Sequence, residues 1–143
     1  MPTNPHQTVY ITQPTTPPRF RRRYLTLPDR FAPAGSNLIV TMGPTGFLLL
    51  FSEKFWVPQR DKILLLPGDD PRNGALKRVI VGNARTETVD KRHRVVVAND
   101  LCEFAQLGKI AYWVPVANHV EVWNPELFSP DNCCSWLNYL PGK

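Results

Sequence analysis

The apolar residues of this 143-residue chain fall into short runs that Gly, Pro, Asn and Asp separate. The runs are rich in β-branched and aromatic side chains, which is typical of strands bounded by turns. Gly43-Pro44-Thr45-Gly46 and Ala117-Asn118 are predicted to be tight turns between consecutive strands. The pattern predicts strands at TVYI (8–11), YLTL (24–27), NLIVTM (37–42), FLLLF (47–51), RVVVA (94–98), KIAYWVPV (109–116) and HVEVW (119–123).

Helices are expected to be few and short, each beginning at a capping residue or a proline. Ser52 can cap a helix that Pro58 limits or kinks, because proline removes a backbone hydrogen bond. Asp70 followed by Pro71 predicts a helix start, and Gly82 predicts its end. Two further short helices are expected at 101–107 and 124–128.

The order of these elements repeats along the chain, with matching elements about seventy residues apart. Each half runs from a basic stretch through a short apolar strand to two strands joined by a turn. Phe51 and Trp56 of the first half correspond to Trp123 and Phe128 of the second. A hairpin-sized unit cannot bury its apolar face alone, so the two copies are expected to pack together as a pseudo-dimer.

The chain length allows one compact domain, or two small halves that share a core. Five prolines among Thr, Asn and Gln predict a flexible or extended arm over residues 1–18. The rest divides into a first module at 19–68 and a second module with the C-terminal tail at 69–143, together one compact unit. The expected fold is mainly β with short helices, an α+β fold.

Positive charge is concentrated in two places. Seventeen Lys and Arg against twelve Asp and Glu give a net charge of +5. One cluster alone is equally well explained as a solvated basic face, whereas two clusters at equivalent places favour a polyanion partner. The clusters are Arg21, Arg22 and Arg23 in the first half, and Lys91, Arg92 and Arg94 around His93 in the second.

Signals for catalysis, cofactors and membranes are weak. The sequence contains no GxGxxG, Walker A or HExxH motif. Cys133-Cys134 lack a partner pair for zinc, and the three histidines are scattered, so neither a metal site, a cofactor nor an enzyme activity is predicted. No run is long enough for a membrane span, and MPTNPHQTVYITQP is not the pattern of a secretory signal. An odd count of three cysteines then fits a reducing cytoplasm.

A spaced pattern in the second half resembles a known family. It comprises a helix ending at Gly82, Asp90 three residues before His93, Arg94 at the start of an apolar strand, and then Leu101, Ala105-x-Leu107-x-Lys109 and Glu121-x-Trp123. Over 76–128, with almost no gaps, this pattern resembles the second half of the MraZ family of bacterial transcriptional regulators. The resemblance implies two tandem AbrB-type swapped-hairpin modules, a double-psi-like fold, packed as a pseudo-dimer.

The first half departs further from that family's loop motif, Asp-x-Lys-Gly-Arg followed by apolar-x-apolar-Pro and an Arg. The later part of the motif is matched by Leu25-Thr26-Leu27-Pro28 and Arg30. In the loop Phe20-Arg21-Arg22-Arg23-Tyr24, the Asp, Gly and Arg of the motif are all replaced, and only Arg22 corresponds to the Lys. In the second copy His93 replaces the Gly and Asn99 the Pro. Because Gly often permits positive φ, this replacement implies a different loop path.

The resemblance implies a nucleoid-associated regulator that binds double-stranded DNA as a ring-like homo-oligomer. Arg and Lys on a loop can neutralise phosphates, and repeated loops on a ring would favour repeated target sites. Arg94 alone falls on the family's Arg position, and its alternative role is to pair with Asp90 and hold the loop. A degenerate scaffold that has lost specific DNA binding is the second possibility, and an antitoxin-like partner binder is the third. The candidate DNA contacts are Arg21, Arg22, Arg23, Lys91, Arg92 and Arg94.

Overall fold

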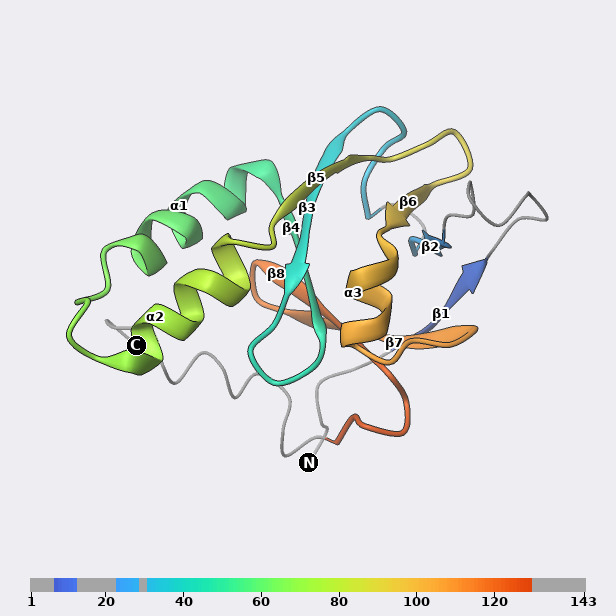
Figure 1. The fold of residues 1–143 in the computed structure, drawn as a ribbon. Coiled ribbons are helices and arrows are strands. Elements are labelled where there is room, and N and C mark those ends of the chain that lie inside the picture. Colours follow the sequence, from blue (N-terminus) through green and yellow to red (C-terminus); the bar gives the residue numbers. More distant parts are fainter. Residues whose placement is uncertain (1–6, 13–22, 29–30, 130–143) are drawn as a thin grey trace.

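The computed structural model describes residues 7–12, 23–28 and 31–129 (Figure 1). They form an eight-stranded antiparallel sheet in the order β5-β3-β4-β8-β7-β1-β2-β6, which confirms the mainly β, α+β expectation. The helices are α1 (Glu53–Leu64), α2 (Pro71–Leu76), its π-helical continuation η2 (Lys77–Val81) and α3 (Asn99–Phe104). The strands are β1 (Gln7–Thr12), β2 (Arg23–Thr26), β3 (Asn37–Met42), β4 (Leu48–Ser52), β5 (Arg85–Thr88), β6 (Arg94–Val97), β7 (Ile110–Val116) and β8 (His119–Trp123).

The strand pairing has an internal twofold pseudosymmetry. Strands β1 to β4 of the first copy correspond in order to β5 to β8 of the second. Equivalent strands pair directly at two places, β4 with β8 and β2 with β6. The remaining cross-pairs are themselves equivalent, because β1 pairs with β7 and β5 pairs with β3. Exchanging the two copies leaves these pairings unchanged, which is the arrangement expected of a pseudo-dimer. The exception is the pairing of β1 with β2, because the equivalent strands β5 and β6 lie at the two ends of the strand order.

Strand β1 lies inside the stretch 1–18 for which an arm is expected. It pairs with β7 along one edge and with β2 at Ile11 and Thr12. Val9 and Ile11 are buried while Thr8 and Tyr10 are exposed, the period-two alternation that the TVYI prediction requires. Residues 7–12 therefore belong to the sheet and not to an arm. By the pseudosymmetry, β1 is the first strand of the first copy.

Apolar side chains are buried on both faces of the central strands. In β4, Leu48 and Leu50 belong to one cluster and Leu49 and Phe51 to another, because successive side chains point to opposite faces. The first cluster includes side chains of α3, and the second includes side chains of α1, α2 and η2. Figure 1 shows α1 and α2 together on one side of the sheet, well away from α3. The sheet is thus covered by different helices on its two sides.

Helix α1 runs through Pro58, contrary to the expectation that this proline would limit it early. Proline at this position removes one backbone hydrogen bond, whereas Trp56 and Ile63 on either side are buried in the second cluster. That burial outweighs the missing bond. The helix expected at 124–128 is wrong as well: this segment is a turn in which Asn124 Oδ1 accepts a hydrogen bond from the Glu126 amide at 2.9 Å.

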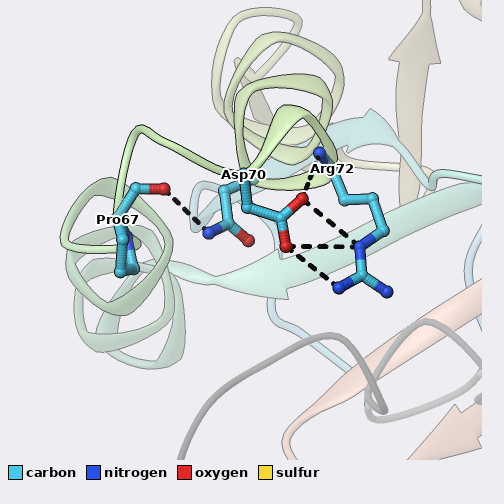
Figure 2. A network of polar contacts seen from close by, with 4 residues as sticks. Pro67, Asp70 and Arg72 are labelled. Carbon is cyan, nitrogen blue, oxygen red and sulfur yellow. Dashed lines mark hydrogen bonds and ion pairs between the residues drawn. The ribbon is translucent and has the colours of Figure 1, made fainter.

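The start of α2 is fixed by the predicted cap. Asp70 Oδ1 accepts a hydrogen bond from the Arg72 amide at 2.9 Å, and the Arg72 guanidinium folds back on the same carboxylate (Figure 2). The helix begins at Pro71 and continues through η2 to Val81, with Gly82 at its end, as the sequence predicts. Among the helices of the described segments, none has the length and apolar character that a membrane crossing requires.

Candidate nucleic-acid interface

The candidate basic residues lie at the two ends of the ribbon formed by β2 and β6. Arg23 begins β2 and stands opposite Val97, while Arg94 begins β6 and stands opposite Thr26. Because the strands are antiparallel, the cluster before β2 and the cluster before β6 are at opposite ends. The structure therefore groups Lys91, Arg92 and Arg94 and leaves Arg23 apart from them. Arg21 and Arg22 lie outside the described residues.

The turn between β5 and β6 is held by the Asp90 carboxylate. Oδ1 accepts hydrogen bonds from the amides of Arg92 and Arg94, both at 2.9 Å, and Oδ2 accepts one from Arg94 Nε at 2.9 Å. Partial burial acts to raise the pKa of Asp90, but the hydrogen bonds from Arg94 and Arg92 outweigh it, so the pKa is lowered. The carboxylate is thus kept ionised at the base of the turn.

His93 occupies the position of the family's loop glycine with a φ of 58°. His93 thus adopts the left-handed conformation that glycine would adopt without strain. Its amide donates to the Asp90 carbonyl at 3.0 Å, and its carbonyl accepts from the Leu27 amide at 2.9 Å. These backbone bonds offset the cost of the conformation, roughly 1–2 kcal/mol for a residue with a side chain.

Arg94 has the structural role that the sequence offered as its alternative. Its guanidinium pairs with Asp90 and also lies over the Tyr24 ring, with Cζ 4.1 Å from the ring centroid. The sequence did not indicate the contact with Tyr24, which lies diagonally across the ribbon from Arg94 because Tyr24 pairs with Val96 and Thr26 with Arg94. Lys91 and Arg92 differ from Arg94, because both are exposed and neither side chain has an ion pair with any described residue. They are the accessible cations of the turn.

Replacing Asp90 with alanine is expected to lower the free energy of unfolding by about 2 kcal/mol, because two backbone amides and Arg94 lose their acceptor. Since the folded pKa is below the ordinary value of 3.8, the stability that Asp90 contributes is present above that pH and is lost as the pH falls further. Urea unfolding at neutral and acidic pH measures both effects.

Asp90→Asn is the matched control, because its amide oxygen can still accept the backbone bonds while the charge is gone. We expect about half the loss for this variant at neutral pH. A change within about 0.5 kcal/mol for Asp90→Ala, the range of ordinary surface substitutions, would contradict the assigned role.

Potential metal ligands are not gathered at this turn or elsewhere in the described segments, where no group of three or more His, Cys, Asp and Glu side chains could hold an ion. Cys102 is a buried free thiol, and burial raises its pKa. Cys133 and Cys134 lie outside the described residues.

Relatives of the chain are found among curated proteins, whereas no family model matches it. It is 41% identical over 93 residues to transcriptional regulator MraZ of Dechloromonas aromatica, covering 65% of this chain and 63% of that protein. It is 34% identical over 117 residues to transcriptional regulator MraZ of Carboxydothermus hydrogenoformans, covering 81% of this chain and 76% of that protein. The chain belongs to the MraZ family.

This membership confirms the resemblance drawn from the second half of the sequence. A third relative, transcriptional regulator MraZ of Aromatoleum aromaticum, is 40% identical over 96 residues, covering 67% of this chain and 65% of its own. The matches to the Dechloromonas and Aromatoleum proteins thus span slightly less than two thirds of those relatives. The eight-stranded sheet and short helices agree with the α+β fold that the family resemblance implies.

Proposed function

We propose that this MraZ family member is a transcriptional regulator that binds double-stranded DNA through its basic loops. The observation that carries the proposal is the Asp90-held turn, which presents Lys91 and Arg92 with both side chains exposed. The names of the relatives support the regulatory role. In the proposal each module supplies one loop. The first module comprises β1 and residues 19–68, with Arg21–Arg23 in its loop, and the second comprises residues 69–143.

The physical basis is the release of counterions when Arg and Lys neutralise DNA phosphates. One short turn offers few such contacts, so the proposal includes a ring-like homo-oligomer that places many turns along repeated sites. It further places the protein in the cytoplasm at the nucleoid. It assigns the chain no catalytic step and no cofactor.

The test is binding of a duplex over a range of salt concentrations, followed by fluorescence anisotropy, for the wild type and for Lys91→Ala/Arg92→Ala. We expect the wild-type affinity to fall steeply with salt. In the variant the slope of log K against log salt should shrink by about 1.8, for two phosphate contacts at 0.9 each, with an affinity loss on the order of tenfold at low salt.

Lys54→Ala/Lys62→Ala is the matched control, because it removes two exposed positive charges from α1, away from both ends of the β2–β6 ribbon (Figure 1). Absence of wild-type binding at low salt would refute the proposal. So would equal slopes for the turn variant and the α1 variant.

A degenerate oligomeric scaffold is the second candidate. It is favoured by one observation: Arg94, at the family's Arg position, is bound by Asp90 and Tyr24. On this alternative the protein sediments as an oligomer and binds no duplex at any salt concentration. A monomer at micromolar concentration would exclude the scaffold and also the multivalent part of the main proposal.

A further inference from the structure

The partly exposed face of the β2–β6 ribbon brings one residue of each copy into contact. Leu25 and Val95 form an antiparallel pair whose side chains are buried. Since successive side chains of a strand point to opposite faces, Tyr24 and Arg94 lie on the other face, which is only partly buried. They are diagonal neighbours, within the reach of aromatic and long side chains. Cζ of Arg94 is 4.1 Å from the centroid of the Tyr24 ring, so the first copy contacts the loop of the second here.

Tyr24 and Arg94 are also equivalent positions of the two copies. The loop motif Asp-x-Lys-Gly-Arg aligns with residues 20–24 in the first copy and with residues 90–94 in the second. Its arginine is therefore Arg94 in the second copy, whereas Tyr24 replaces it in the first. A second guanidinium at position 24 would repel that of Arg94, but the face of an aromatic ring attracts it. The replacement thus makes the contact between these two positions a stabilising one.

The contact bears on the basic turn because Arg94 is one of the groups that hold this turn. Its Nε donates to Asp90 Oδ2 at 2.9 Å, while Asp90 Oδ1 accepts from the Arg92 amide at the same distance. The Arg94 side chain is 21% exposed, so the carboxylate at its Nε edge and the ring on its face leave it little freedom. The first copy also bonds the turn through its backbone, since the Leu27 amide donates to the His93 carbonyl at 2.9 Å. The first copy thus supports the turn that carries the accessible cations of the second.

We propose that Tyr24 is a positioning residue for DNA binding, which acts by holding Arg94 against Asp90. The ring itself contacts no DNA. It keeps the turn between β5 and β6 in the conformation in which both exposed cations reach phosphates, so that less order has to be gained on binding. The inference rests on the proposed function, because it concerns the same site and the same partner. It makes the loop of the second copy a joint product of the two copies.

The test compares duplex binding by Tyr24→Ala and Tyr24→Phe over a range of salt concentrations. Tyr24→Ala should lower the affinity about fourfold, the factor that corresponds to a cation–π contact at a partly exposed site. The slope of log K against log salt should equal that of the wild type, because the number of phosphate contacts is unchanged. Tyr24→Phe keeps the ring and should bind like the wild type. Tyr112→Ala is the matched control, since it removes another half-buried tyrosine ring, packed on Phe128, and should lower stability without changing the affinity for DNA.

The orientation of Arg94 is measured separately by its Nε–H proton resonance. A proton near the face of an aromatic ring is shifted upfield, so the wild type and Tyr24→Phe should show this shift and Tyr24→Ala should lose it. If Tyr24→Ala loses the shift but binds duplex like the wild type, the positioning role is overturned and the proposed function stands. Equal affinity losses for Tyr24→Ala and Tyr24→Phe would also overturn it, because they would assign the effect to the hydroxyl group. If the wild type binds no duplex, the proposed function fails and this role of Tyr24 fails with it.

Discussion

Replacing Trp123 with alanine should lower the free energy of unfolding by about 4 kcal/mol, as expected for removing a large aromatic side chain from a packed core. Trp123 is 2% exposed. Its ring is stacked on Phe47, with centroids 4.6 Å apart and an interplanar angle of 15°. Its Nε1 donates to Glu121 Oε1 at 2.7 Å, a bond between two buried side chains. Equilibrium urea unfolding measures the loss.

Trp123→Phe is the informative comparison, because it retains most of the ring and removes only the indole donor. We expect this variant to lose about 2 kcal/mol, the cost of leaving a buried acceptor without one of its hydrogen bonds. Equal losses for the two variants would mean that the stack on Phe47 adds nothing. A loss below about 1 kcal/mol for Trp123→Ala would contradict its place in the core.

The same side chain tests how the two copies are joined. Trp123 is in β8 of the second copy and Phe47 precedes β4 of the first, so their stack crosses between equivalent strands. Leu49 and Glu121, which are paired at the centre of the β4–β8 register, lie on the pseudo-twofold axis and are fully buried. A copy separated from its partner would expose this surface. The large expected loss therefore follows from the pseudo-dimer.

The period-two apolar pattern predicted the strands well where one or both faces are buried. NLIVTM and HVEVW match β3 and β8 at both ends. Strand β5, RTET, was missed because its side chains are polar and only partly covered, so that its place depends on pairing with β3. Pairing of this kind is long-range and leaves no local pattern. Helix α1 was underestimated for a related reason, since burial of Trp56 and Ile63 is also a tertiary effect.

The sequence predicted which charged residues belong to the candidate site, but not all of the contacts that they make. The spacing of Asp90 and Arg94 did indicate their ion pair, because both residues lie in one turn. The Tyr24 contact with Arg94 depends on the β2–β6 register, and the two residues are far apart in sequence.

Acidification from pH 6.5 to about 4 should reduce the free energy of unfolding by about 3 kcal/mol through His119 alone, at 1.36 kcal/mol for each pKa unit. His119 is 7% exposed at the start of β8, with the Phe51 ring 5.3 Å away. Burial lowers its pKa to about 4 from the ordinary 6.5. Below pH 6.5 the unfolded chain therefore takes up a proton that the folded chain does not, and stability falls until the folded pKa is reached.

Urea unfolding at several pH values between 6.5 and 4 measures this effect against His119→Leu, which has no group to titrate at that position. The variant should show a shallower decline over the same interval. Asp90 and Asp100 do not affect this comparison between pH 6.5 and 4. Hydrogen bonds from arginine keep the pKa of both carboxyl groups below 3.8, so the stability that they contribute is lost only at lower pH. Parallel declines for the wild type and His119→Leu would show that the imidazole is not held neutral by burial.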